Sequence, residues 1–287
     1  MRYASPLSFQ RILSKSQWKN VSSDQHNIGI QFVEKPWEPL RAIPVDREGE
    51  FVYTLRPRSD KFPRRLLCEI TVVDNTKIIT IRSTYKIENL TLYPLELMLV
   101  NDAGQPIHPL HKIIPGNDFS VPIEAVTKSR IVIQPDRKYT IGPVFDGGNG
   151  FTEGFGYKWC SPVRWEDLIS KKGFIMKCLH SDPKEAAFRF QAWVQTDSGE
   201  IARFVGIYQT KTLGLNKFFR KYPRINLKLR APLELENLLP YDVEYRIYDK
   251  NTDQNWKSYL RKGGVMPIHS VELGHFILLN VTMQDTG

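Results

Sequence analysis

The hydrophobic positions of this chain fall in short runs rich in Val, Ile, Thr, Tyr and Phe, which Gly, Pro, Asn and Asp interrupt. Runs of this kind between turn-forming residues are typical of β-strands. Turn signals lie at Asn101–Gly104 and at Asp146–Gly150. The pattern predicts strands at Ile28–Phe32, Phe51–Leu55, Leu66–Val73, Ile78–Ile81, Leu95–Val100, Ile131–Ile133, Phe174–Cys178, Phe188–Val194, Leu227–Leu229, Val243–Tyr248 and Phe276–Val281.

Helical periodicity is weak along the whole chain. No long stretch repeats its apolar positions every 3.6 residues, and the 19 prolines argue against long helices. The best helix candidate is Lys211–Lys221. Many short strands with frequent turns predict an all-β fold of the sandwich or barrel type.

An internal repeat indicates that the strands belong to repeated structural modules. Residues 87–97 read IENLTLYPLEL and residues 235–245 read LENLLPYDVEY, and they align without gaps. The offset from Asn89 to Asn237 is 148 residues. The same offset brings ITIR at 79–82 opposite LKLR at 227–230, and VPI at 121–123 corresponds to MPI at 266–268. Self-similarity over such a distance indicates repeated structural units.

A second repeat sets the expected boundaries. WEPL at 37–40 resembles WEDL at 165–168, and each is followed by two strand-like runs. We therefore expect tandem β-sandwich modules that form a slice of a longer repeat array. Residues 1–82 would be the C-terminal part of one module, 83–230 a complete module with an insertion near 197–223, and 231–287 the N-terminal part of the next.

The asparagine of each repeat lies between two strands. An Asn side chain can bond backbone two residues further on, and it suits a sharp turn. Pro94 and Pro240 lie near the same bend and fix φ there. Asn89 and Asn237 are thus expected to latch a turn in each module. A compatible alternative is that their amides help to shape a peptide-binding edge.

Composition excludes several other classes. Hydrophobic residues make up 41% and charged residues 25% of the chain, which is typical of a globular protein rather than a disordered one. No apolar run reaches the length of a membrane span, and the N-terminal residues lack the apolar stretch of a secretory signal. Three cysteines with no metal-ligand spacing are expected to be reduced, buried thiols of a cytosolic protein, namely Cys68, Cys160 and Cys178.

Catalytic motifs are absent from the sequence. It contains no G-x-S-x-G, H-E-x-x-H or P-loop pattern. His108 and His111 have a spacing that a metal can use, but no further ligands can be placed beside them. The glycine-rich run at 147–156 lacks the Lys-Ser/Thr pair of a phosphate loop and favours a long loop. We expect a protein that is not an enzyme and that has no cofactor and no metal.

The repeated motif resembles a known family. IENLTLYPLEL and LELENLLPYDVEYRIYD resemble the repeats of the adaptor-binding (VAB, also SHR-binding) domain of the vacuolar protein sorting-associated protein 13 family. GYKWCSPVRW at 156–165 is similar to the aromatic G-x-x-W-S-x-x-[IV]-x-W stretch of those modules, with Cys160 inserted before the serine. Leu92 departs from the pattern, because the second copy has Pro240 there.

This resemblance implies a role in lipid transport and vacuolar protein sorting. Family members are bridge-like lipid transfer proteins, and this region consists of β-sandwich modules that each carry one characteristic Asn, matched here by Asn89 and Asn237. It implies organelle adaptor proteins with Pro-X-Pro motifs as partners. Nucleic acid is not expected as a partner, because the sequence contains no recognised nucleic-acid-binding signature. The resemblance also implies a cytoplasmic protein, peripheral at membrane contact sites of endosome, vacuole or mitochondria. The expected partner-binding or module-defining residues are Asn89, Asn237, Tyr93 and Tyr241.

A basic segment offers an alternative function. The chain has 40 Lys and Arg against 31 Asp and Glu, for a net charge of +9. Within KFFRKYPRINLKLR at 217–230, basic side chains surround Phe218, Phe219 and Tyr222. Such a segment can bind anionic lipid directly, or it can be a solvated loop that leads into a strand. The expected lipid contacts are Lys217, Arg220, Lys221 and Arg224.

Overall fold

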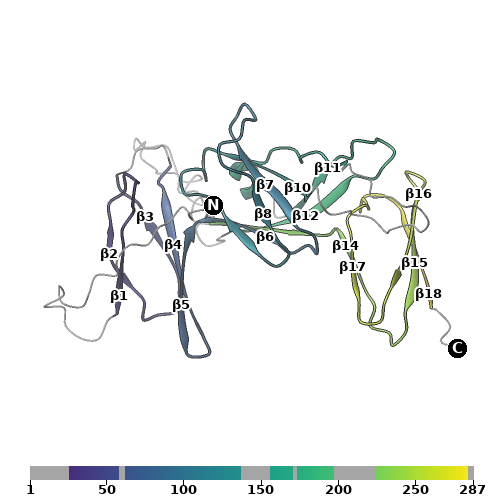
Figure 1. The fold of residues 1–287 in the computed structure, drawn as a ribbon, viewed down its shortest axis with the longest axis horizontal. Coiled ribbons are helices and arrows are strands. Elements are labelled where there is room, and N and C mark those ends of the chain that lie inside the picture. The colour runs from purple at the N-terminus through teal and green to yellow at the C-terminus, as the bar shows by residue number, and fades with distance from the viewer. Residues whose placement is uncertain (1–25, 58–61, 137–155, 171–172, 197–223, 284–287) are drawn as a thin grey trace, which may run out of the picture. The chain divides into compact units, whose positions relative to one another are not determined.

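The computed structural model describes residues 26–57, 62–136, 156–170, 173–196 and 224–283. Nearly all regular structure in these ranges is β-strand, and α1 (Trp165–Ile169) is a single short helix among them (Figure 1). The predicted all-β fold, built from several separate sheets, is confirmed. The predicted helix at Lys211–Lys221 and the insertion near 197–223 lie outside the described residues.

The chain divides into two compact units. The described residues of the first lie within 26–86 and at Ser120–Thr127 and Arg224. Those of the second lie within Ile87–Phe119, Lys128–Thr196 and 225–283. The second unit therefore extends across the predicted module boundary at residue 230.

The first unit contains two small antiparallel sheets. One pairs β1 (Asn27–Ile30) with β2 (Leu40–Pro44), and the other has the order β3 (Gly49–Thr54), β4 (Arg65–Val73), β5 (Thr76–Ser83). Asp74 and Asn75 join β4 to β5 with φ of 49° and 59°, the left-handed pair that a tight two-residue hairpin requires. The core gathers apolar residues from both sheets, namely Ile30, Phe32, Trp37, Ile43, Val45, Leu55, Leu66, Cys68, Ile70 and Ile123.

The central strands form two sheets. The three-stranded sheet has the order β10 (Arg130–Pro135), β7 (Leu95–Val100), β8 (His111–Ile113). The five-stranded sheet has the order β11 (Gly173–Cys178), β12 (Phe188–Thr196), β13 (Ile225–Arg230), β6 (Tyr85–Asn89), β9 (Asp118–Ser120). Alternate residues of β7 are buried, as expected for a strand with one face on a core. Cys178 on β11 donates from Sγ to the Ile133 carbonyl on β10 at 3.2 Å, which connects the two sheets.

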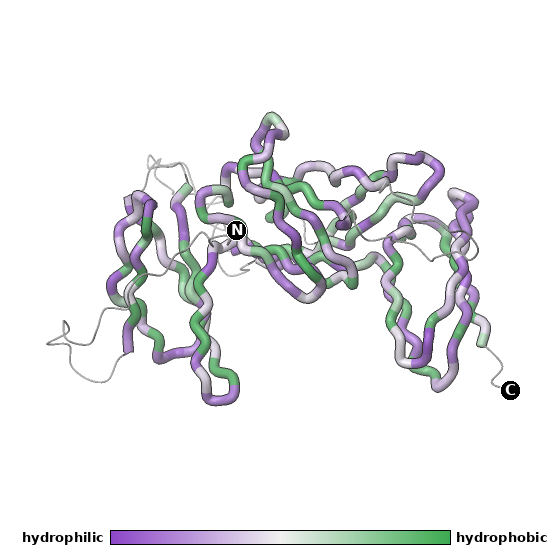
Figure 2. The backbone as a smooth tube through the Cα atoms, viewed as in Figure 1, coloured by the Kyte–Doolittle hydropathy of each residue, from purple (hydrophilic) through white to green (hydrophobic). Residues whose placement is uncertain are grey.

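The last strands repeat the plan of β6 to β10. β14 (Leu233–Glu236) pairs with β17 (Val265–Ile268), as β6 lies beside β9. The order β16 (Gln254–Leu260), β15 (Val243–Asp249), β18 (Ile277–Met283) matches the order β8, β7, β10. Their core consists of Val243, Tyr245, Ile247, Leu260, Ile268 and Val271. Hydrophobic positions follow the strands here and in the other sheets (Figure 2).

The two matched tryptophan segments differ in backbone structure. Trp165 begins α1, whereas Trp37 lies in irregular backbone before β2. Both indole side chains are buried, at 6% exposure each. The two segments therefore share a buried tryptophan side chain. The residues around each tryptophan determine its backbone conformation.

Candidate functional site

Asn89 is fully buried at the end of β6, and its side chain uses its whole hydrogen-bonding capacity. Its Nδ2 donates to the carbonyls of Tyr93 and Ile113, each at 2.8 Å. Its Oδ1 accepts from the Thr91 amide at 3.0 Å and the Thr91 hydroxyl at 2.7 Å. An amide has two donors and two acceptor positions, so nothing remains for an external ligand.

Asn237 makes the same contacts in the second copy. Its Nδ2 donates to the Tyr241 carbonyl at 2.8 Å and the Leu260 carbonyl at 3.1 Å, and its Oδ1 accepts from the Leu239 amide at 3.1 Å. It is 4% exposed. Tyr241, Leu260 and Leu239 lie four, about two dozen and two residues after Asn237. The partners of Asn89 lie at the same separations. The two asparagines therefore occupy equivalent surroundings.

A glycine turn completes each latch. The Gly116 amide donates to the Asn89 carbonyl at 2.8 Å, and the Gly263 amide donates to the Asn237 carbonyl at 2.8 Å. The two glycines have φ of 77° and 69°, a conformation that residues with a Cβ avoid. The latch thus joins the end of one strand to a turn between two others.

A further pair of equivalent residues escaped the sequence analysis. Asn101, after β7, accepts from the Ala103 amide at 2.9 Å, and Asp249, at the end of β15, accepts from the Asn251 amide at 2.9 Å. They are separated by the same 148 residues as Asn89 and Asn237. The sequence contained a signal for this equivalence, because Asn and Asp side chains can both accept backbone hydrogen bonds at such a turn.

The two predicted tyrosines lie in different surroundings. Tyr93 is half-buried, and its ring centroid is 5.6 Å from that of His269 and 6.2 Å from that of Phe188. Burial raises the pKa of Tyr93, so its hydroxyl stays protonated. Tyr241 is 41% exposed, beside Leu238 at 81%. The structure brings only Tyr93 into a cluster of aromatic side chains.

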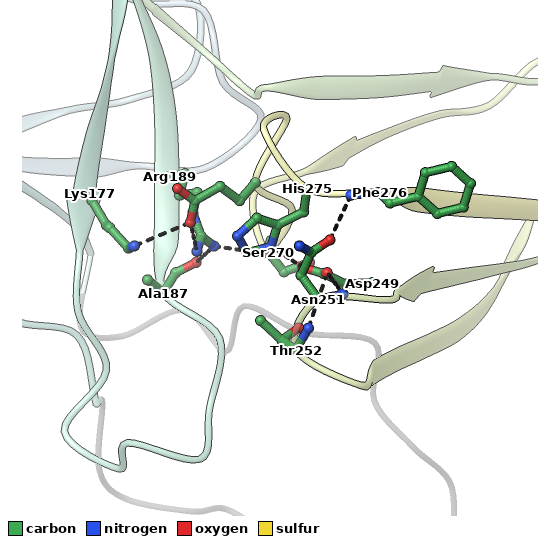
Figure 3. Close-up of polar contacts among 10 residues, drawn as sticks. Lys177, Ala187, Arg189, Asp249, Asn251, Thr252, Ser270, His275 and Phe276 are labelled. Atoms are coloured by element: carbon green, nitrogen blue, oxygen red, sulfur yellow. Dashed lines mark hydrogen bonds and ion pairs between the residues drawn. The ribbon is translucent and has the colours of Figure 1, made fainter.

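That cluster is part of a junction within the second unit, where Lys177 on β11 and Arg189 on β12 contact residues 269–272. Figure 3 shows the polar contacts of Lys177 and Arg189. The buried Arg189 guanidinium donates to the Ser270 carbonyl at 2.7 Å and to the Glu272 carboxylate at 2.8 Å. Lys177 lies 3.3 Å from the same carboxylate. The Arg189 amide also donates to the His269 carbonyl at 2.9 Å. We call this set of contacts the junction.

His269 is the buried centre of the junction. Its Nδ1 lies 2.7 Å from the Arg189 carbonyl, which only accepts, so Nδ1 carries the proton. Its ring stacks on Phe188 with centroids 4.0 Å apart and planes 10° apart. Burial lowers the pKa of His269 to about 4, so the imidazole is neutral at physiological pH. Its Nε2 is a buried acceptor with no hydrogen-bond partner among the described residues.

A cavity of about 280 Å³ opens beside His269. Its walls come from both sides of the junction, and most of them are aromatic or aliphatic. They are formed by Tyr93, Tyr157, Glu185, Ala186, Phe188, Tyr245, Ile247, Trp256, Ser258, Met266, Pro267, Ile268, His269 and Ser270.

The junction gives a first prediction. Glu272→Gln keeps the shape of the side chain but removes the charge that faces Arg189. Because Glu272 is 39% exposed, we expect a loss of only about 1 kcal/mol from the free energy of unfolding of the second unit. Denaturant titration measures it. Lys177→Ala, which removes an exposed ion pair, is the matched control and should cost less; equal effects would contradict the assigned role of Arg189.

The basic segment is only partly described. Lys217, Arg220 and Lys221 lie outside the described residues. Arg224 forms an ion pair with Glu50, so its charge is already matched within the first unit. No helix in the described part of the chain is long and apolar enough to cross a membrane.

The histidines and cysteines that could carry other chemistry have packing roles in the described residues. No group of metal-ligating side chains occurs in the described ranges, and the His111 ring instead lies 4.3 Å from that of Phe119. The three cysteines are buried and free. The contact with Cys160, together with burial, raises the pKa of the Cys178 thiol, so it is protonated and unreactive.

The similarity to known proteins extends over the part of the chain that contains the repeats. A family model described as the vacuolar-sorting associated protein 13, adaptor binding domain, matches residues 13–287. Intermembrane lipid transfer protein VPS13 of Chaetomium thermophilum is 32% identical over 267 residues, which is 92% of this chain and 7% of that protein. Intermembrane lipid transfer protein VPS13A of Mus musculus is 24% identical over 249 residues, 85% of this chain and 7% of that protein. The chain thus spans a small part of the curated relatives it matches.

Proposed function

Because this chain belongs to the family of vacuolar-sorting associated protein 13 adaptor binding domains, we propose that it is a non-catalytic module that binds Pro-X-Pro motifs of organelle adaptor proteins. In this proposal the module recruits a bridge-like lipid transfer protein to organelle membranes. The observation that supports it is the pair of equivalent hydrogen-bonded turns at Asn89 and Asn237, which recur at the interval of the sequence repeat.

The asparagines act indirectly in this function. The Asn89 side chain uses its whole hydrogen-bonding capacity, and the Asn237 side chain uses both of its donors and one acceptor position. In the proposal they hold the turn that supports each sheet rather than contact a ligand. Residues 1–82, 83–230 and 231–287 remain the proposed module boundaries. The proposed location is cytoplasmic and peripheral, at membrane contact sites of endosome, vacuole or mitochondria.

A rigid β scaffold suits the proposed ligand. A proline-rich peptide is already extended, so it loses little conformational entropy on binding. Aromatic side chains on the scaffold can receive its rings, and backbone hydrogen bonds can add affinity. The fold needs no cofactor for this task.

The proposal predicts selective peptide binding. In a fluorescence titration the 287-residue chain should bind a Pro-X-Pro peptide at least tenfold more tightly than the same peptide with both prolines replaced by alanine. The difference arises because alanine loses both ring contacts and pre-ordering. Equal affinity for the two peptides would contradict the proposal.

Direct binding of anionic lipid is the second candidate, which the net charge of +9 favours. Vesicles with and without phosphatidylserine distinguish it. Under this alternative, sedimentation with anionic vesicles falls when Lys217, Arg220 and Lys221 are changed to alanine. The ion pair of Arg224 with Glu50 weighs against a contribution from that residue.

A further inference from the structure

Two buried cysteines of the second unit lie side by side. Cys160 is 3% exposed and Cys178 is 0% exposed, and their thiols are in hydrogen-bonding contact. Both sulfur atoms also contact one residue of β10: the Ile133 amide donates to the Cys160 Sγ at 3.2 Å, and the Cys178 Sγ donates to the Ile133 carbonyl at 3.2 Å. We propose that this pair is a modification site, a dithiol that peroxide oxidises to an intramolecular disulfide. The inference goes beyond the proposed function and does not depend on it.

The backbone holds the two cysteines near each other. The Lys158 amide donates to the Leu179 carbonyl at 2.7 Å, so the segment that carries Cys160 runs alongside the end of β11, which carries Cys178. Antiparallel segments paired in this way bring Cα atoms to about 4.5–5.5 Å, and a disulfide accepts about 4.4–6.8 Å. The sulfur atoms can therefore bond through side-chain movement, without a rearrangement of the strands.

The repeated fold does not itself require sulfur at these places. Cys160 lies five residues before the tryptophan of the WEDL segment, and Phe32 lies five residues before the tryptophan of the WEPL segment. Cys178 ends the six-residue strand β11, and the matched six-residue strand β3 ends with Thr54. The first unit therefore builds the matched elements with an aromatic ring and a hydroxyl. The thiol pair is a separate property of the second unit.

The two thiols have different roles in the oxidation. The pKa of Cys160 is lowered, because the contact with Cys178 and the Ile133 amide stabilise its thiolate. The Cys160 sulfur attacks one oxygen of hydrogen peroxide, the O–O bond breaks, and Cys160 becomes a sulfenic acid while water leaves. The Cys178 sulfur then attacks the Cys160 sulfur, the S–O bond breaks, and a second water leaves with the Cys178 proton. The two thiols together lose two electrons and two protons, and one peroxide is reduced to two waters.

Cys178 is the resolving thiol, because by itself it stays protonated and does not meet the oxidant first. The contact with Cys160 and burial hold its pKa above the usual range. Once Cys160 is a neutral sulfenic acid, the first of these causes is gone, and the neighbouring sulfur has become an electrophile.

The disulfide would join the two central sheets covalently. Cys178 belongs to β11 of the five-stranded sheet, and the Cys160 amide donates to the Ile133 carbonyl on β10 of the three-stranded sheet at 3.0 Å. In a reducing compartment a bond of this kind is transient, and thiols reverse it.

Peptide mapping of the full chain tests the site. The folded 287-residue chain is treated with hydrogen peroxide, free thiols are blocked with N-ethylmaleimide, and a tryptic digest is analysed by mass spectrometry without reduction. Cleavage after Lys and Arg places the two cysteines in separate peptides, WCSPVR and CLHSDPK. We expect these two peptides to be linked, with two hydrogen atoms fewer than the separate peptides, and to separate with dithiothreitol. The thermal unfolding midpoint of the second unit should rise by about 5–10 °C on oxidation.

Serine variants separate the two steps. In Cys178→Ser, Cys160 should stay as a sulfenic acid, which dimedone labels, and no linked peptides should form. Cys160→Ser should abolish the linkage without dimedone labelling at Cys178. Cys68→Ser, in the first unit, is the matched control and should form the linkage as the wild type does.

The wild-type chain alone can overturn the proposal, even where a serine variant does not fold. The proposal is wrong if both thiols of the folded chain stay free in peroxide, or if the linkage appears only after denaturation. It is equally wrong if Cys160 proceeds to the sulfinic acid with no linkage to Cys178.

Discussion

Replacing Asn89 with alanine should destabilise its sheets by on the order of 3–5 kcal/mol, the largest effect we expect from a single substitution. The change leaves the buried carbonyls of Tyr93 and Ile113 without their donor, and the Thr91 amide and hydroxyl without their acceptor. Each unpaired buried group costs about 1–3 kcal/mol, and water can relieve only part of it at a position with 0% exposure.

Hydrogen exchange followed residue by residue is the appropriate measurement, since a chain of several units need not unfold in one step. Protection should fall around β6 and β8. Asn101→Ala is the matched control: this asparagine also accepts backbone amides, but in an exposed turn that water can reach. It should cost about 1 kcal/mol or less. Similar losses for the two variants would contradict the assigned role of burial.

Asn237→Ala extends the comparison to the second copy. The Asn237 Oδ1 accepts one hydrogen bond fewer than the Asn89 Oδ1 among the described residues, because Leu239 offers an amide but no hydroxyl where Thr91 offers both. We therefore expect a smaller loss than at Asn89. The order of the two effects tests whether hydrogen bonds, rather than the volume of the side chain, hold the turn.

Acidification should loosen the junction through His269. Its pKa is about 4 in the folded chain, because burial disfavours the charged ring, against about 6.5 in an unfolded one. Between these values the unfolded chain binds the proton and the folded chain does not. The contribution of His269 to the free energy of unfolding therefore falls as the pH drops from about 6.5 to about 4, and this contribution changes no further below pH 4.

The expected loss is about 3.5 kcal/mol, because the pKa of His269 is about 4 in the folded chain and about 6.5 in the unfolded one, and each unit of difference corresponds to about 1.4 kcal/mol. Denaturant titrations of the full chain at a series of pH values measure it. His269→Phe keeps a ring against Phe188 but cannot titrate, so it should be less stable at neutral pH and show a flatter pH dependence.

Burial also lowers the pKa of His111, so His111→Phe is the control. That variant should retain most of the slope that His269 contributes. If His269→Phe leaves the slope unchanged, the acid-sensitive group lies elsewhere.

The amino-acid sequence alone predicted many of the strands, the repeat and, as one of two compatible roles, a turn latch at its asparagines; it did not predict the short strands β2, β6, β8, β9, β14, β16 and β17. The predicted features depend on contacts between near neighbours: the Asn89 side chain reaches residues two and four positions ahead. Such turns follow from the residue types themselves, because Asn can replace backbone partners locally wherever it lies between two strands. The hidden equivalence of Asn101 and Asp249 could have been found by the same reasoning.

Only the tertiary structure decided what surrounds those latches. Tyr93 and Tyr241 match in the repeat, yet one lies in an aromatic cluster and the other faces solvent. His269 and Arg189 are 80 residues apart and carry no motif, and their pairing follows from the path of the chain. Burial, hydrogen-bond saturation and the pKa of His269 depend on those distant neighbours, so a local pattern cannot contain them.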